Sequence, residues 1–358
     1  MATAIQQQQP DAEAVEAFAG RALTDVAGTM ATLFCVIGDR LGLFVALDEG
    51  PATAAELAAR THIDERYALE WLRGLAAAGY LEQAGDGRYA LPAAHAPVLA
   101  REGGVAFLGG GYHELGGMLP TLERVVEAIR VGGGVPQAAY PDDAYVGMAR
   151  FSAAWVDHGL LESWLPLLPD LQGRLEAGIS WADVGCGAGH AVIRLAQEFP
   201  RSTFAGFDVF PAQVDRARAA AQAAGIADRV RFEVADASHG VPGRWDVIST
   251  LDVVHDSVDP AALLAGIRRA LAGDGTYLML EINCADDHAD NHGPLATVLY
   301  GFSLLYCMTT SLAHGGAGLG TCGCPPAVVD RLGHTAGFRT VREVPIDNPI
   351  NRLYELRP

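Results

Sequence analysis

The sequence contains no lysine, so arginine supplies all 25 basic side chains, against 43 acidic residues. The formal net charge of the 358-residue chain is −18. Binding to a phosphate backbone or to an anionic membrane surface needs a basic face on the protein. We therefore expect neither nucleic acid nor a membrane among the partners of this chain.

Other missing features bear on where the protein works. We find no uncharged apolar run of about 18 residues that would predict a membrane span. The glutamine-rich residues 1–10 lack the basic-then-apolar order of a signal peptide. None of the six cysteines forms a C-x-x-C pair. In a chain of this length that pattern indicates reduced thiols, so we expect a cytoplasmic protein.

The sequence does not predict a metal site. Cys322 and Cys324 lie near His314, but a single residue between two cysteines is a poor spacing for zinc. The polar segment 285–292 offers carboxylates to magnesium, although a solvated loop explains it equally well. We assign no metal ligands.

Three glycines at alternate positions, Gly185, Gly187 and Gly189, form the most informative motif. An apolar strand over 179–184 precedes them, and a helical pattern begins at Ala191. Glycine lets the backbone come close to a ligand, and the N–H groups at a helix start attract negative groups. A plain turn would also explain three glycines, so the motif needs support from its surroundings.

That support comes from acidic residues at strand ends. Asp208 follows the second predicted strand, Asp236 follows the third, and Asp252 follows the fourth. An acid after the second strand of an α/β nucleotide fold accepts hydrogen bonds from ribose hydroxyls. The predicted strands cover 179–184, 203–207, 230–234, 245–249, 276–282, 338–344 and 351–356.

This order of landmarks resembles the class I methyltransferases that depend on S-adenosylmethionine (SAM). The resemblance implies an α/β fold, with a Rossmann-like seven-stranded sheet, and SAM as the cofactor. It assigns to the SAM site Asp183, Gly185, Cys186, Gly187, Gly189, Asp208, Val209, Phe210, Asp236, Ala237, Leu251 and Asp252.

The N-terminal part is mainly helical and ends in a hairpin. Thr53 and Glu56 form a capping box, and Asp86-Gly87 marks a tight turn, which together predict a winged helix. Such a module either reads DNA or serves in packing and dimerisation. Residues 1–110 carry seven arginines against fourteen acids, which disfavours DNA. The module resembles the N-terminal domain of small-molecule O-methyltransferases, which implies a homodimer; a compact monomer is the alternative.

We divide the chain into a disordered tail over 1–15, a winged-helix dimerisation domain over 16–110, a helical linker over 111–175 and a SAM-binding catalytic domain over 176–358. Side chains in the linker share a helical spacing that is also typical of a core stripe. In the resembled family this helix lines the substrate pocket. A later apolar helix, predicted over 294–312, carries further aromatic side chains that we infer to line it. The predicted substrate residues are Met148, Phe151, Trp155, His158, Tyr300 and Tyr306.

His255 lies just beyond the fourth predicted strand, at the sheet edge where ligands bind. Histidine is well matched to accepting a proton near neutral pH, although a lone histidine is often structural. By resemblance to the plant-type O-methyltransferases, His255 is the general base, Glu281 orients it, and Asp256 is the aspartate of the motif. That family has a second carboxylate at a position near Gly323, where this chain has no acid.

Over the whole chain, the closer resemblance is to the Rv2258c-like winged-helix methyltransferases of actinobacteria. The residues that carry it are His255-Asp256, Asp259-Pro260, Tyr300, Cys307-Met308-Thr309 and Gly315 to Gly320. The predicted function is SAM-dependent methylation, at oxygen, of a small aromatic or polycyclic molecule of secondary metabolism. The alternatives are another SAM-assisted reaction on the same fold, or a SAM-sensing regulator that binds DNA. The sequence does not identify the substrate or the acceptor atom.

Overall fold

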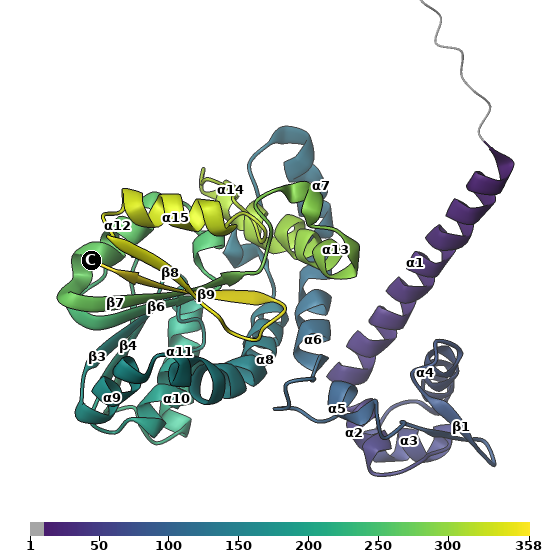
Figure 1. Ribbon diagram of the computed structural model, residues 1–358. Helices are drawn as coiled ribbons and strands as arrows, with labels where there is room; N and C mark the ends of the chain where they lie inside the picture. Colours follow the sequence, from purple (N-terminus) through teal and green to yellow (C-terminus); the bar gives the residue numbers. More distant parts are fainter. Residues whose placement is uncertain (1–10) are drawn as a thin grey trace, which may run out of the picture. The chain divides into compact units, whose positions relative to one another are not determined.

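The computed structural model describes residues 11–358, and the chain forms two compact units (Figure 1). The first ends at Gly116, and the second covers Gly117–Pro358. The sequence places the first boundary six residues earlier, and the second unit is not divided at 175. The predicted tail lies mostly outside the described residues. It is wrong for residues 12–15, which form the first turn of a helix.

The first unit has the helix and hairpin order of a winged helix. Its elements are α1 (Ala12–Arg40), α2 (Leu43–Asp48), α3 (Ala54–Thr61), α4 (Glu65–Ala77), β1 (Glu82–Gly85), β2 (Arg88–Ala90) and α5 (Ala96–Leu99), and α6 (Gly109–Met118) crosses the boundary. Thr53 and Glu56 form the predicted capping box at the start of α3. Asp86 and Gly87 take the positive φ angles, 49° and 71°, that a tight hairpin turn requires.

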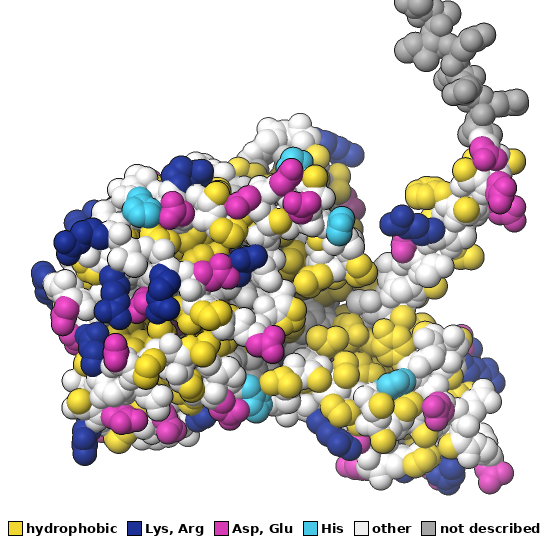
Figure 2. Space-filling view, viewed as in Figure 1, with side chains coloured by type: hydrophobic (Ala, Val, Ile, Leu, Met, Phe, Trp, Pro, Cys, Tyr) yellow, Lys and Arg dark blue, Asp and Glu magenta, His cyan; other side chains and the backbone are white. Residues whose placement is uncertain are grey.

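Apolar side chains lie exposed along α1. Five of them are each more than half exposed, and Figure 2 shows apolar side chains between charged ones along this helix. They are Val15, Phe18, Leu23, Val26 and Met30. A helix face of this kind is common where a partner covers it.

Two helical runs, Ala12–Arg40 and Gly293–Ala313, are long and apolar enough to cross a membrane by length and composition. The expectation that no stretch meets this test is therefore wrong. A core helix passes the same test, and Tyr306 and Cys307 of the second run belong to a buried cluster of the second unit. Length and composition alone are weak evidence for a span.

The second unit is built on a seven-stranded sheet in the order β5-β4-β3-β6-β7-β9-β8. The strands are β3 (Ser180–Val184), β4 (Thr203–Asp208), β5 (Val230–Val234), β6 (Trp245–Leu251), β7 (Leu271–Ile282), β8 (Thr340–Val344) and β9 (Asn351–Arg357). All neighbouring pairs are parallel except those of β9, which runs antiparallel to both β7 and β8. The Rossmann-like seven-stranded sheet expected from the sequence is confirmed.

Helices cover both faces of this sheet (Figure 1). One apolar core joins the sheet to α9 (Pro169–Ala177), α10 (His190–Glu198) and α11 (Pro211–Ala223). The other joins it to α12 (Pro260–Ala270) and α15 (Pro326–Thr335). Because helices cover both faces, most residues of the central strands β3 and β6 are buried.

A third group of helices forms a separate aromatic cluster. Its members include residues of α7 (Leu122–Val131), α8 (Asp142–Gly159) and α13 (Gly293–Phe302), and residues of the turn that leads into α14 (Met308–Ala313). The helix predicted over 294–312 is interrupted by a π-helical turn at Ser303–Cys307. Such turns insert one residue and are frequent at functional sites, because they redirect the side chains around them.

Candidate functional site

The glycine turn after β3 is pinned to the neighbouring strand. The N–H groups of Gly185 and Cys186 both donate to the carbonyl oxygen of Phe207, at 2.7 and 3.0 Å. Gly185, Gly187 and Gly189 all have positive φ angles, between 51° and 79°. These contacts fix the turn, and the φ values explain why glycine occupies all three positions.

The three glycines face different surroundings. A Cβ atom at Gly185 would lie 2.5 Å from Val253, and one at Gly189 would lie 2.7 Å from Phe232. A Cβ atom at Gly187 would meet nothing within 4 Å among the described residues. The middle glycine therefore borders open space, while its neighbours allow close packing.

Asp208 lies beside that open space. Its carboxylate accepts the N–H of Gly187 at 2.9 Å and that of Phe210 at 2.8 Å. Burial raises the pKa of Asp208, and the backbone donors partly offset that rise. Of its predicted companions, Val209 is exposed and Phe210 packs on the ring of Tyr145.

Asp183 lies deeper, inside β3. Its carboxylate accepts the hydroxyl of Ser249 at 2.6 Å, and Ser249 in turn accepts the indole N–H of Trp181 at 2.8 Å. Burial raises the pKa of Asp183 to about 7. Nearby Cys186 is buried, and burial also raises the pKa of its thiol.

The other predicted cofactor residues lie at the ends of β5 and β6. Asp236 accepts the N–H and hydroxyl of Ser238, next to buried Ala237. Leu251 packs against the core that contains α10. Asp252 has a positive φ of 56°, and both of its oxygens accept the side-chain amide of Asn351, at 2.7 and 2.9 Å. Sequence reasoning missed Asn351, because this contact joins segments far apart in the chain.

These residues fit the cofactor that the sequence implies. Gly187 leaves room for a ligand at the carboxyl edge of the sheet, and the turn approaches it without side chains. Asp208 and Asp236 place acceptors at the ends of neighbouring strands, where ribose hydroxyls and an adenine amine can donate. The carboxylates suit the positively charged sulfonium and amino groups of SAM.

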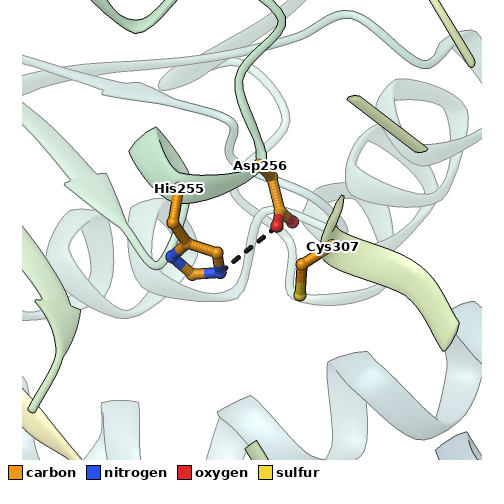
Figure 3. Close-up of side chains that lie close together, drawn as sticks. All are labelled: His255, Asp256 and Cys307. Carbon is orange, nitrogen blue, oxygen red and sulfur yellow. Dashed lines mark ion pairs between the residues drawn. The ribbon is translucent and has the colours of Figure 1, made fainter. Parts of the chain in front are cut away.

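His255 lies in a short 3₁₀ turn after β6 and is buried. Its Nδ1 atom is 2.6 Å from Oε2 of Glu281, and its Nε2 atom is 3.2 Å from Oδ1 of Asp256. Glu281 is fully buried and accepts the N–H of Val254 with its other oxygen. Because a carboxylate can only accept, this arrangement places a proton on Nδ1 and directs Nε2 toward Asp256 (Figure 3).

The electrostatics of His255 follow from these neighbours. Burial alone would lower the pKa of its imidazole, but the negative charges of Glu281 and Asp256 raise it well above the ordinary value. The structure thus brings the three predicted catalytic side chains into contact. Gly323 lies where the resembled family has a further acid, and a Cβ atom there would lie 2.3 Å from the backbone oxygen of Leu319. In this chain the acid that contacts Nδ1 of His255 is Glu281.

Cys307 completes this cluster and was not assigned a role from sequence. Its thiol contacts both His255 and Asp256 from the end of the π-helical turn (Figure 3). Burial raises the pKa of this thiol to about 12. The resemblance to the Rv2258c-like group included Cys307, but a lone cysteine far along the chain gives no signal of such a contact.

The six predicted substrate residues do not form one cluster. Met148 and Tyr306 share the aromatic cluster around Tyr145, but Trp155 packs beside Trp164 against a different core. Three more lie partly open. His158 is 3.4 Å from Glu162, Tyr300 is exposed, and Phe151 is half-buried.

Comparisons with known proteins identify the family of this chain. Residues 175–301 match the family model described as a methyltransferase domain, and residues 29–101 match the Rv2258c-like winged HTH domain. The N,N-dimethyltransferase OxyT of Streptomyces rimosus is 30% identical over 254 residues, which cover 68% of this chain and 72% of OxyT.

Solved structures share the fold. The structure described as PigF with SAH has a TM-score of 0.68 at 22% identity, covering 95% of this chain and 99% of PigF. The mitomycin 7-O-methyltransferase MmcR has a TM-score of 0.65 at 20% identity, covering 98% of this chain and all of MmcR. The winged helix, the sheet and the SAM landmarks thus agree with these comparisons, and the chain belongs to the SAM-dependent methyltransferases that carry an N-terminal winged-helix domain.

Proposed function

We propose that this methyltransferase acts on a hydroxyl oxygen of a small aromatic or polycyclic molecule, with His255 as the general base. SAM supplies a methyl group made electrophilic by the attached sulfonium. The observation that carries the proposal is the contact of Nδ1 of His255 with buried Glu281, which makes Nε2, once it has lost its own proton, the ring nitrogen that accepts a proton. Asp256, 3.2 Å from Nε2, stabilises the imidazolium that forms.

The printed names of the relatives support a small acceptor but differ on its atom. MmcR is named a mitomycin 7-O-methyltransferase, whereas OxyT is named an N,N-dimethyltransferase. Nitrogen is therefore our second candidate acceptor, since a protonated amine also needs a base before it can attack.

We place the reaction in secondary metabolism and in the cytoplasm, and we propose no DNA-binding role for the acidic winged helix.

A screen of acceptors tests the proposal. The purified chain is incubated with SAM and phenols, amines or carboxylic acids, and S-adenosylhomocysteine release and product mass are recorded. We expect release with at least one phenol and a product heavier by one methyl group. Methylated amines alone would support the second candidate. S-adenosylhomocysteine without a methylated product, or binding without turnover, would contradict methyl transfer.

The variant His255→Ala tests the base. We expect turnover to fall by about 10²- to 10⁴-fold while SAM binding stays unchanged. The loss should shrink as pH rises through the ionisation of an acidic phenol, because the phenolate needs no base. Glu281→Gln should reduce turnover less, because it removes orientation and leaves the ring. Near wild-type turnover of His255→Ala at neutral pH would refute the assignment.

A further inference from the structure

Three different atoms that can bind a metal ion lie close together, and one of them belongs to the proposed base. Nε2 of His255, Oδ1 of Asp256 and Sγ of Cys307 all lie within 4.8 Å of one another (Figure 3). His255 and Asp256 come from the 3₁₀ turn after β6, and Cys307 comes from the π-helical turn between α13 and α14. Two separate elements thus direct three side chains to one point.

The hydrogen bonding around these atoms leaves one position that only a proton or another cation can occupy. Glu281 holds the proton of Nδ1, so Nε2 is the ring nitrogen that offers a lone pair when the imidazole is neutral. The atom opposite, Oδ1 of Asp256, is buried and has no well-directed hydrogen bond within the described part of the chain. Two acceptors 3.2 Å apart repel each other unless a proton or another cation lies between them.

The donor set favours a zinc-like ion. Imidazole nitrogen, thiolate sulfur and carboxylate oxygen all bind Zn²⁺ at about 2.0–2.3 Å. Magnesium and calcium prefer oxygen ligands alone. Three protein ligands leave a fourth tetrahedral position open, and the Asp256 side chain is 26% exposed, which gives access from solvent.

Glu281 contacts the second ring nitrogen of His255, as is typical of histidines that bind metals. Histidines that bind metals usually donate their second ring proton to a carboxylate or a carbonyl, which fixes the tautomer and strengthens the ligand. Glu281 makes this contact at 2.6 Å and is itself held by the N–H of Val254. A second group, Asp252 with His255 and Glu281, also lies within 4.8 Å. Its carboxylates already accept hydrogen bonds, so we do not assign it an ion.

We propose that His255, Asp256 and Cys307 form a binding site for Zn²⁺ or a similar thiophilic divalent ion. The sequence alone predicts no such site. Binding forms bonds from the ion to Nε2, Oδ1 and Sγ, and it releases to solvent the thiol proton of Cys307 and the proton that Nε2 carries while the imidazole is charged. A second consequence rests on the proposed function. An ion on Nε2 removes the lone pair that accepts the proton of the acceptor, so zinc inhibits methyl transfer.

Binding is tested on the full chain after treatment with a chelator. Zinc is added in competition with a colorimetric zinc indicator, and cobalt is added separately as a spectroscopic probe. We expect one ion per chain and, with cobalt, a thiolate-to-metal charge-transfer absorption in the near ultraviolet. Absence of that absorption, or zinc affinity no better than that of the His255→Gln variant, would overturn the site.

Matched variants separate this site from other thiols. Cys307→Ser should abolish the charge-transfer band and weaken zinc binding at least about 100-fold, and Glu281→Gln should weaken it by about 10- to 100-fold. Cys322→Ser, which changes a half-buried thiol outside the trio, should leave both measurements unchanged. Asp256→Asn is a second ligand variant in case Cys307→Ser does not fold, as judged by circular dichroism. A band lost in Cys322→Ser and kept in Cys307→Ser would refute the assignment.

Turnover measured with and without zinc tests the predicted inhibition of methyl transfer. We expect equimolar zinc to inhibit the wild-type chain, a chelator to restore turnover, and Cys307→Ser to resist inhibition. Zinc bound as described with turnover unaffected would leave the site standing and contradict His255 as the base. No binding, together with loss of turnover in His255→Ala, would overturn the site and leave the base in place.

Discussion

At the scale of single residues, the imidazole of His255 lies between two carboxylates that contact different ring nitrogens. Glu281, the partner of Nδ1, is buried and fixed by the backbone, whereas Asp256, the partner of Nε2, is partly open to solvent. The buried partner therefore sets the orientation of the ring, and the open side is where another molecule can enter.

Asp208 gives a prediction for the cofactor. We expect Asp208→Ala to lose most SAM affinity, because each lost hydrogen bond to a charged group costs about 1.5–3 kcal/mol. The loss of SAM affinity has two sources. The variant removes the acceptor for the ribose hydroxyls, and it also removes the carboxylate that accepts the N–H groups of Gly187 and Phe210. Isothermal calorimetry with SAM measures it.

Asp215→Ala is the matched control, because this exposed aspartate on α11 pairs with Arg218 of the same helix. It should bind SAM as the wild-type chain does. Equal affinity in Asp208→Ala and Asp215→Ala would show that Asp208 does not hold the cofactor.

Asp183 gives a prediction for pH. Burial raises the pKa of this carboxyl to about 7, against about 3.9 in the unfolded chain. Between these values the folded chain keeps a proton that the unfolded chain releases, so the free energy of unfolding falls as pH rises. The contribution is at most about 4 kcal/mol.

The variant Asp183→Asn keeps an acceptor for Ser249 and cannot ionise. Thermal unfolding at pH 5 and pH 8 compares it with the wild-type chain. The wild-type midpoint should fall more between these pH values than that of the variant. Parallel changes in the two proteins would mean that Asp183 does not hold its proton in the folded chain.

At the scale of elements, one glycine of the turn after β3 borders open space, and another packs against neighbouring side chains. Both Gly187→Ala and Gly189→Ala place a side chain at positive φ, which costs roughly 1–2 kcal/mol. At Gly189 the new Cβ also meets Phe232 and Ala217, so stability should fall further. At Gly187 it enters open space, so SAM affinity should fall with little extra loss of stability. Thermal unfolding and calorimetry together measure both effects, and the reverse pattern would contradict the assignment of the open space to a ligand.

Much of the fold could be predicted from patterns among neighbouring residues in the sequence. The hairpin turn at Asp86-Gly87, the Thr53 capping box and all seven strands of the sheet were predicted, because each depends on neighbouring residues. The start of β7 at Leu271 was missed, since Gly273 and Gly275 have the composition of a turn. The π-helical turn was missed because one extra residue in a helix leaves no mark in the composition.

The site was predicted less completely. The pairing of His255 with Glu281 came from the resemblance to a family, and strand-end positions supported Asp208. Cys307 and Asn351 could not be found in this way, because their contacts join distant segments through tertiary packing. The predicted substrate residues shared a helical spacing, but spacing does not tell which side of a helix meets a pocket and which meets a core.

At the scale of the whole molecule, we expect a homodimer formed through the first unit. The exposed apolar side chains of α1 are the observation that motivates it. Light scattering at micromolar concentration should give twice the mass of the chain. The double variant Phe18→Asp with Leu23→Asp should give the mass of one chain.

Val131→Asp is the control for this prediction. Val131 is as exposed as Leu23 but lies on α7, in the other unit. It should leave the mass unchanged. A wild-type chain that scatters as a single copy would refute the dimer.

The position of β9 has a consequence for how the protein is made. This strand follows β8 in the chain but lies between β7 and β8, and Asn351 at its start holds Asp252 next to the base. During synthesis, β8 is therefore made before there is any strand for it to pair with. The parallel part of the sheet can form during synthesis, but β8 and the support of Asp252 must wait for the later strand. A chain that ends before Asn351 would thus be an incomplete sheet, with β7 left as an unpaired edge.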